Sequence, residues 1–182
     1  YDYSRLLYTK SSYAFLMNAE TIYKKLKSEE LEVILRAPIW GDLDDLYSLH
    51  KQLVEEEAMI GADSIVDKGQ MMDMHVQLLK RSESGGIVSI VAEVNGQAVG
   101  QCNARKRGGR LRHTAELGVF VRAEYRNMGI GTNLLKELEI QAKKQDLSIL
   151  FLEVFAINPS RTLYKKLGYK EMGVMPNGIQ YK

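Results

Sequence analysis

An Asn-Gly pair between two apolar runs is the sequence feature that most constrains the fold of this chain. Asn95-Gly96 separates Ile87–Val94 from Gln97–Arg107, and Asn-Gly is the preferred pair for the two-residue type I′ turn of a β-hairpin. Gly108-Gly109 predicts a second hairpin, which leads into a long strand over Leu111–Val121. Antiparallel strands therefore form the middle of the expected sheet.

Helical and strand patterns alternate on either side of these hairpins. Leu31–Pro38 predicts a first strand, and helices follow from Asp42, as N-cap, to Leu53 and over Lys68–Arg81. Later elements are a helix over Gly129–Lys144, a strand over Ser148–Ala156, a helix over Asn158–Leu167 and a strand over Tyr169–Val174. Because strands joined by crossover helices run parallel, the order βααβββαβαβ predicts a mixed α/β sheet of six to seven strands.

The first thirty residues differ in composition from the rest of the chain. Five of the ten tyrosines lie within Tyr1–Tyr23, and Leu16, Ala19, Tyr23 and Leu26 recur at helical spacing. We expect residues 1–30 to form an amphipathic helical extension that packs on the domain or on a second subunit, so a homodimer is one expected partner. Residues 31–182 then form the main domain, since this length suits a single domain.

Composition excludes several classes of site. A formal charge of +2 gives no argument for a nucleic-acid or membrane partner. The single cysteine, Cys102, rules out an intramolecular disulfide or a cysteine-based metal centre, and His50, His75 and His113 lack metal-ligand spacing, so no metal is expected. Without a long apolar span or a signal-peptide pattern, the expected location is the cytoplasm.

The run from Arg126 to Thr132 follows a strand and opens a helix. Amides at a helix start are unpaired and carry partial positive charge, so they attract anions. Gly129 and Gly131 remove side chains that would hold an anion away, and Arg126 adds a forked cationic donor. The run is typical of a diphosphate site, although a plain turn explains a glycine pair equally well. Leu134 stands where a dinucleotide fingerprint needs its third glycine, and no P-loop sequence occurs.

Two motifs resemble those of the GNAT superfamily of N-acetyltransferases. Arg126-x-x-Gly129-x-Gly131, preceded by Ala115–Val121, resembles motif A, and Asn158–Tyr169, which ends in Leu-Gly-Tyr, resembles motif B. The resemblance extends from Leu31 to about Met175 and leaves out the first thirty residues. It implies an enzyme that uses acetyl-CoA as co-substrate and transfers the acetyl group directly to a primary amine of a small molecule or a protein, in a ternary complex.

The resemblance also implies where acetyl-CoA binds. The diphosphate would lie on the glycine turn, and the pantetheine arm beside the preceding strand. Asn158 would contact the arm, although a helix cap is an alternative role for this residue. The implied cofactor-binding residues are Val119, Phe120, Val121, Arg126, Asn127, Met128, Gly129, Ile130, Gly131, Thr132, Asn158 and Tyr164.

Acetyl transfer needs one group that takes a proton from the attacking ammonium and another that gives a proton to the leaving thiolate. Tyr164 occupies the motif B position where the family places the general acid, and a packing tyrosine is the alternative. Glu116 and Glu153 match carboxylates that different family members use as base, Glu153 that of the ribosomal-protein-type members. A salt bridge or a strand end explains either carboxylate equally well. Glu116 is the first candidate.

Other features leave rival interpretations open. Arg105–His113 brings five cations and a histidine into nine residues, and we interpret it as a solvated hairpin tip rather than a nucleic-acid patch. Cys102 is expected to be a small buried side chain. Two rivals to the enzyme are a non-catalytic acyl-CoA-binding module and a nucleic-acid-associated domain. The family usually has a closing strand after Pro176–Ile179, so we expect that strand to be missing or the sheet edge to be covered by a neighbouring chain.

Overall fold

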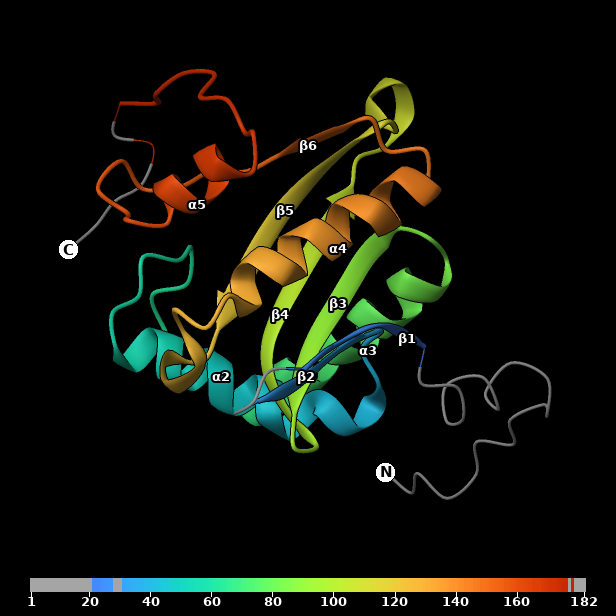
Figure 1. Ribbon diagram of the computed structural model, residues 1–182, viewed down its shortest axis with the longest axis vertical. Coiled ribbons are helices and arrows are strands. Elements are labelled where there is room, and N and C mark those ends of the chain that lie inside the picture. Colours follow the sequence, from blue (N-terminus) through green and yellow to red (C-terminus); the bar gives the residue numbers. More distant parts are fainter. Residues whose placement is uncertain (1–20, 28–30, 177, 179–182) are drawn as a thin grey trace.

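A computed structural model describes residues 21–27, 31–176 and 178, and in it six strands form one sheet in the order β1-β2-β3-β4-β5-β6 (Figure 1). All neighbouring strands are antiparallel except β5 and β6, which are parallel. The mixed α/β prediction is therefore confirmed.

The strands are β1 (Ile22–Lys27), β2 (Glu32–Arg36), β3 (Ile87–Val94), β4 (Gln97–Lys106), β5 (Thr114–Val121) and β6 (Ile149–Phe151). The helices are α2 (Leu43–Glu55), α3 (Lys68–Glu83), α4 (Ile130–Lys144) and α5 (Arg161–Lys166), and 3₁₀ turns cover Trp40–Asp42, Gly109–Leu111 and Ala123–Tyr125.

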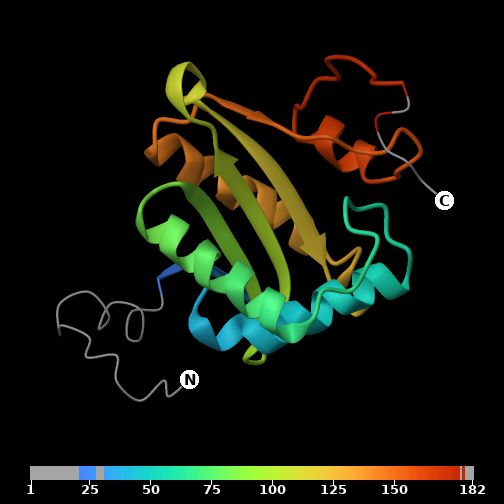
Figure 2. The ribbon, with the colours of Figure 1, turned by 180° about the vertical axis from the view of Figure 1, so that it is seen from behind.

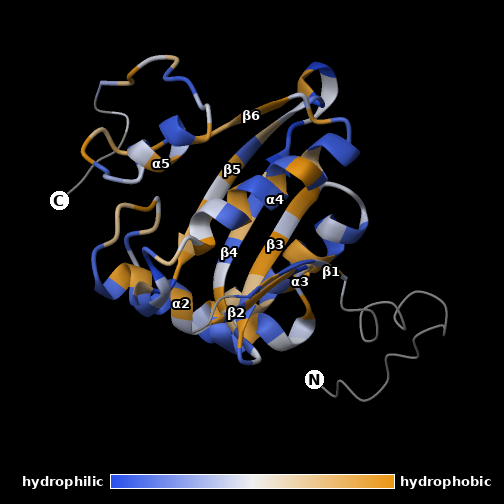
Figure 3. Cartoon of the chain, viewed as in Figure 1, coloured by the Kyte–Doolittle hydropathy of each residue, from blue (hydrophilic) through white to orange (hydrophobic). Residues whose placement is uncertain are grey.

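Helices cover both faces of the sheet. Helix α4 lies across one face, and α2 and α3 lie on the other (Figures 1 and 2). Strand β3 is buried along almost its whole length and is mostly apolar, with Ser89 and Glu93 as its polar residues (Figure 3), as expected for a strand covered on both sides. Side chains alternate along β5, so Leu117 and Val119 face α4, whereas Phe120 packs against the α2 side.

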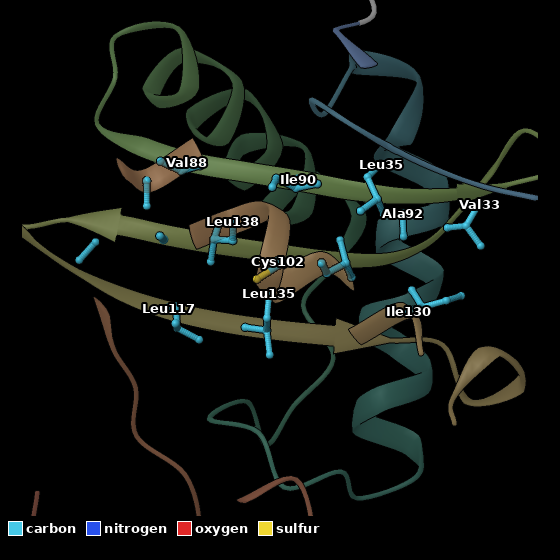
Figure 4. Close-up of a cluster of buried hydrophobic side chains, with 14 of the residues drawn as sticks. Val33, Leu35, Val88, Ile90, Ala92, Cys102, Leu117, Ile130, Leu135 and Leu138 are labelled. Carbon is cyan, nitrogen blue, oxygen red and sulfur yellow. The ribbon is translucent and has the colours of Figure 1, made fainter. Parts of the chain in front are cut away.

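The larger core lies between α4 and the sheet (Figure 4). Leu135 and Leu138 of α4 pack there against Ile90 of β3 and Cys102 of β4, all fully buried. Burial, with a smaller contribution from the charge of Glu139, raises the pKa of the Cys102 thiol. Cys102 is thus the small buried side chain that the sequence predicts.

The predicted turns and central helices are present. Asn95 and Gly96 both adopt positive φ, 51° and 79°, as a type I′ turn requires. Helix α3 begins with a capping box, in which the Gln70 amide donates to Asp67 Oδ1 (2.9 Å) and the Asp67 amide donates to Gln70 Oε1 (3.1 Å).

At the N-terminal end, the expected helix is wrong for Ile22–Lys27, which form strand β1 paired with β2. The pairing shifts register between Ile22 and Lys24. Tyr23 and Leu26 both pack against the core although they are three residues apart. A strand with a bulge can therefore imitate helical spacing. Residues 1–20 and 28–30 of the expected extension lie outside the described residues.

At the C-terminal end, the strand expected over Tyr169–Val174 is absent from the described residues. The strand expected over Ser148–Ala156 is only Ile149–Phe151. Both differences arise at the edge of the sheet, where β6 pairs with β5 over only three residues. A strand this short offers few backbone groups with which a seventh strand could pair. The observed order is ββααβββαβα, and β1 supplies the sixth strand.

A buried ion cluster fixes the start of α2 to the sheet. Arg36 donates to both carboxylate oxygens of Asp42 (2.7 and 2.9 Å) and to Glu93 Oε2 (2.6 Å). Asp42 also accepts the Ile39 amide (2.8 Å). It occupies the N-cap position of α2 as predicted, but its side chain makes no capping hydrogen bond to that helix. Burial lowers the pKa of Arg36, but its bonds to Asp42 and then Glu93 outweigh this effect and raise the pKa overall.

Replacing Asp42 with alanine is expected to destabilise the fold strongly. Arg36 is 2% exposed, and removing one partner of a buried ion pair costs about 3–5 kcal/mol. The matched control is Asp44→Ala, which removes an exposed pair with Lys68 (2.7 Å) and should cost less than about 1 kcal/mol. Urea denaturation measures both values. Equal losses in the two variants would contradict a structural role for the buried cluster.

Candidate functional site

Strands β5 and β6 separate soon after they begin to pair. Their register joins Thr114 to Ile149, Ala115 to Leu150 and Glu116 to Phe151 and goes no further, whereas β4 pairs with β5 as far as Val121. Within the described residues, the part of β5 after Glu116 therefore has a strand on only one side (Figure 2). Backbone amide and carbonyl groups on the open side need partners, and an extended ligand that carries amides can supply them.

The glycine turn lies at the end of this open edge. After the 3₁₀ turn Ala123–Tyr125, Asn127 and Gly129 adopt positive φ (62° and 78°) and lead into α4. The Asn133 amide donates to the Gly129 carbonyl (3.0 Å), while the preceding amides of the first helical turn have no carbonyl within the helix to reach. The structure thus brings together the open strand edge and the predicted anion site.

Gly131 keeps the space between the turn and its neighbours open. A Cβ at this position would lie 3.8 Å from Val121 Cγ2 and 3.8 Å from Leu163 Cδ2. A longer side chain would therefore extend into the space between β5 and α5. Residues Val119 to Thr132 consequently fit a diphosphate followed by an extended arm, although their cofactor contacts remain predictions.

Arg126 has protein partners in this structure. Its Nε donates to the Val121 carbonyl (2.9 Å), and its Nη2 forms an ion pair with Glu56, just after α2. Gln52 of α2 also donates to Glu124 (3.1 Å) and accepts the Ala123 amide (3.2 Å). The end of α2 is thus tied to the glycine turn. Because Glu56 is far from Arg126 in sequence, no local pattern predicts this contact, and a phosphate-binding role for Arg126 remains a prediction.

Tyr164 of α5 packs against the core on the α4 side of the sheet. Its ring meets that of Tyr169 edge to face, with centroids 6.0 Å apart. Burial, with a smaller contribution from Cys102, raises the pKa of Tyr164 to about 12. The phenol therefore keeps its proton at neutral pH, as a general acid must. The sequence did not predict this ring contact, because Tyr169 stands out in it only by its place at the end of motif B.

Both candidate bases are exposed to solvent. Glu116 lies opposite Arg105 on one side and Phe151 on the other. The alternation of β5 puts it on the α2 side of the sheet, the opposite side from Tyr164. Glu153 follows two residues after the end of β6. Solvation thus explains how these carboxylates are tolerated near apolar strands, and the choice between them as base remains a prediction.

Asn158 is bound to neighbouring backbone. Its Oδ1 accepts the Ser160 amide (2.8 Å), and its Nδ2 lies 3.5 Å from the Met59 carbonyl in the loop after α2. Helix α5 begins at Arg161. The side chain therefore orders the turn before α5, but the N-cap of that helix is Ser160, so the predicted capping role of Asn158 is wrong. Its contact with the pantetheine arm remains a prediction.

A hollow of about 1250 Å³ lies beside β6, formed with α4, α5 and the segment that follows α5. Tyr164 and Glu153 are among its lining residues, together with Glu139 and Tyr169. No residue between Val119 and Thr132 lines it. The hollow is therefore distinct from the glycine turn. The backbone groups that need partners lie along the open edge of β5 and not in the hollow.

Metal-ligand clusters and membrane-spanning helices are both absent from the described part of the chain. No group of three or more His, Cys, Asp or Glu side chains there is arranged to hold a metal ion. No helix among these residues combines the length and the apolar character needed to cross a bilayer.

Comparison with known proteins assigns the family. The model of the acetyltransferase (GNAT) family matches residues 45–169. The chain therefore belongs to the GNAT family of acetyltransferases.

Curated relatives match over part of their length. An N-alpha-acetyltransferase from Sulfurisphaera tokodaii is 37% identical over 97 residues, which cover 47% of this chain and 58% of the relative. An uncharacterized N-acetyltransferase from Methanocaldococcus jannaschii is 36% identical over 109 residues, covering 57% of this chain and 46% of the relative. The chain thus spans about half the length of the curated relatives that it matches.

Solved structures share the fold. The ribosomal-protein-alanine N-acetyltransferase from Brucella melitensis superposes with a TM-score of 0.69 at 31% identity, over 76% of this chain and 85% of that one. A putative acetyltransferase from Salmonella typhimurium, solved with acetyl-CoA, gives a TM-score of 0.72 at 22% identity, over 82% and 86% of the two chains. At that identity the second likeness concerns the fold alone.

The raised pKa of Tyr164 predicts a pH dependence of stability. Since the folded state raises this pKa from 10.0 to about 12, it favours the neutral phenol. The resulting stabilisation is fully present below pH 10 and is lost as pH rises from 10 to 12. Absorbance titration at 295 nm should show a phenol that ionises near pH 12 and is missing in Tyr164→Phe. The control is protein in urea, where tyrosines ionise near pH 10. If Tyr164→Phe still showed the phenol that ionises near pH 12, the assignment of this pKa to Tyr164 would be contradicted.

Proposed function

We propose that this chain is an N-acetyltransferase that transfers the acetyl group of acetyl-CoA directly to a primary amine in a ternary complex. The observation that carries the proposal is the open edge of β5, which ends at a glycine turn. The half-buried Tyr164 of α5 packs against the same core as Val119 and Val121 of that strand and keeps its proton at neutral pH. Membership of the GNAT family supports it.

The residues present fit acetyl-CoA in two respects. The first turn of α4 offers unpaired amides and the positive end of the helix dipole to a diphosphate. The open edge of β5 offers backbone donors and acceptors to the two amides of a pantetheine arm. Gly131 leaves room between these two parts.

The chemistry requires two proton movements by this chain. When bound, acetyl-CoA supplies an acetyl thioester with a thiolate leaving group. Tyr164 holds a proton on its phenol oxygen at neutral pH and would donate it to the sulfur as the C–S bond breaks. The phenolate would then regain a proton from the nitrogen that has formed the new N–C bond. A carboxylate, Glu116 first and Glu153 second, accepts the proton of the attacking ammonium. Because Glu116 and Tyr164 lie on opposite sides of the sheet, acid and base would act from the two sides of the gap between β5 and β6.

For the acceptor, we propose the α-amino group of a polypeptide. The support comes from the relatives, one named an N-alpha-acetyltransferase and another a ribosomal-protein-alanine N-acetyltransferase. Glu153 supports this choice too, since it matches the position that the ribosomal-protein-type members use. A small-molecule amine is the alternative acceptor, and a screen that includes polyamines and amino sugars tests it.

Replacing Tyr164 with phenylalanine is expected to separate catalysis from binding. Loss of a general acid lowers kcat by about a hundredfold or more, whereas the dissociation constant for acetyl-CoA should change less than about threefold, because the ring remains in place. Steady-state kinetics on N-terminal peptides and calorimetric titration with acetyl-CoA measure the two quantities. Tyr169→Phe is the matched control, since it removes a neighbouring hydroxyl, and its kcat should remain near that of the wild type.

The same two measurements also distinguish an acetyltransferase from a non-catalytic acyl-CoA-binding module. A wild-type protein that binds acetyl-CoA but acetylates no amine in a broad panel would be a non-catalytic acyl-CoA-binding module. Acetylation with an unchanged kcat in Tyr164→Phe would assign the tyrosine to packing and place the acid elsewhere.

Glu116→Gln and Glu153→Gln are expected to differ in their pH profiles. The variant that lacks the base can use only amine that is already deprotonated in solution. Its kcat/KM should therefore keep rising tenfold per pH unit at pH values where the kcat/KM of the wild type has become constant. The other variant keeps the wild-type profile and serves as its control. Glu116→Gln is expected to show the change. If neither profile changes, solvent alone takes the proton.

A further inference from the structure

Basic residues from three separate segments meet at the end of the sheet opposite the glycine turn. The segments are the last turn of α3 with the loop after it, the β4–β5 connection, and the end of α4 (Figures 1 and 2). Backbone bonds join them: the Lys106 amide donates to the Gly86 carbonyl (3.1 Å), and the Ser148 amide donates to the His113 carbonyl (2.9 Å). We call this surface the basic end. Its cations are Lys80, Arg81, Arg105, Lys106, Arg107, Arg110, Arg112, Lys143 and Lys144.

The basic end is strongly positive in a chain that is almost neutral. Its three segments, residues 80–86, 105–113 and 143–148, contain nine Lys and Arg but only two acids, Glu83 and Asp146. They therefore carry +7, and because the whole chain carries +2, all other residues together carry −5. The small net charge thus hides a marked separation of charge, which the composition alone could not reveal.

The cations of the basic end also form no ion pairs within the described residues, although Glu116 of β5 lies opposite Arg105. None of the nine forms an ion pair with a described carboxylate, whereas Arg36, Lys51, Lys68, Arg126, Arg161 and Lys165 all do. Seven of the nine are exposed, and Arg81 and Lys106 are partly so. The guanidinium of Arg107 is held 5.6 Å from the centre of the Phe151 ring.

Helix dipoles explain only part of this arrangement. Cations in the last turn of a helix are favoured by its negative end, which accounts for Lys80, Arg81, Lys143 and Lys144. The five cations of residues 105–112 lie on a strand end and a 3₁₀ turn, where no such field acts. Their mutual repulsion is therefore unexplained unless an anion binds there.

We propose that the basic end binds the phosphate backbone of a nucleic acid. Nucleic-acid interfaces are polar and strongly positive, and arginine is suited to phosphate because of its forked donors. A protein partner would need an apolar centre to its interface, and Leu111 is the one large apolar side chain exposed on the described segments of the basic end. The solvated-tip interpretation of residues 105–113 did not take into account the cations that α3 and α4 add.

This surface is separate from the glycine turn, although it borders Glu116, which lies opposite Arg105. Strand β5 runs eight residues from Thr114, beside the basic end, to Val121, beside the glycine turn. The seven steps between these two residues span about 24 Å at roughly 3.4 Å per residue. A nucleic acid on the basic end therefore leaves the glycine turn accessible, so the diphosphate of acetyl-CoA should still bind there.

Fluorescence anisotropy with a labelled 20-nucleotide oligouridylate tests the proposal, with no acetyl-CoA present. We expect a dissociation constant of about 1–100 µM at 100 mM KCl, weakening steeply with salt. Arg110→Glu/Arg112→Glu should weaken binding about tenfold or more and lower the slope of log Kd against log salt by about 1.4, because each lost phosphate contact on a single strand contributes about 0.7. The matched control is Lys136→Glu/Lys166→Glu, the same change of charge at exposed positions on α4 and α5, which should change Kd less than about twofold.

Three results would overturn the proposal. The first is no binding of the oligonucleotide by the wild type. The second is an equal loss of affinity in the two double variants, because net charge would then be the cause, and the third is tight competition by a poly-glutamate peptide of equal charge, which would indicate an acidic protein partner. Equal thermal midpoints show that both double variants are folded. A labelled DNA of the same length, compared with the RNA, shows which nucleic acid is preferred.

Discussion

The early separation of β5 from β6 is the constraint on which the rest of the site depends. Parallel pairing stops at Glu116 and Phe151, so β5 continues for five residues with one edge open within the described chain. A strand edge with unpaired amides and carbonyls is unfavourable unless something binds it. The helix start beyond Gly129 lies at the end of the same strand. One backbone arrangement thus provides both an open strand edge for an extended ligand and a helix N-terminus for the anionic group of that ligand.

Contacts across the sheet connect this opening to the helix on the other face. Gln52 and Glu56 bond to the turn that contains Ala123 and Arg126, and Arg36 holds the start of α2 through Asp42. Helix α2 is therefore fixed at both ends, once to the buried core and once to the glycine turn. A ligand that draws Arg126 away from Glu56 would release one of these contacts, so the cofactor site and the α2 surface are physically connected.

Local patterns predicted the parts of the fold whose causes are local. The type I′ turn at Asn95-Gly96, helix α3 and the glycine turn before α4 all follow from short-range geometry, and all are present. Strand β1 was missed because its register shift brings Tyr23 and Leu26 to one face at helical spacing. The strand over Tyr169–Val174 was predicted but is absent from the described residues. A strand forms only beside a partner strand, and no local pattern specifies that partner.

The candidate site was predictable to a similar degree. Motifs located the glycine turn, Tyr164 and the two carboxylates along the chain. They could not show that Arg126 is paired with Glu56, or that Glu116 and Tyr164 lie on opposite sides of the sheet, because these facts depend on contacts distant in sequence. The basic end is a similar case, as three segments contribute to it and each alone has an ordinary explanation.

Hydrogen–deuterium exchange with and without acetyl-CoA tests the central claim most directly. If the open edge of β5 and the glycine turn bind this ligand, protection should increase in peptides that cover Leu117–Val121 and Met128–Thr132, and α3 should remain unchanged as an internal reference. Protection confined to the hollow beside β6, with no change along β5, would contradict the account, because the open edge would then have no part in binding.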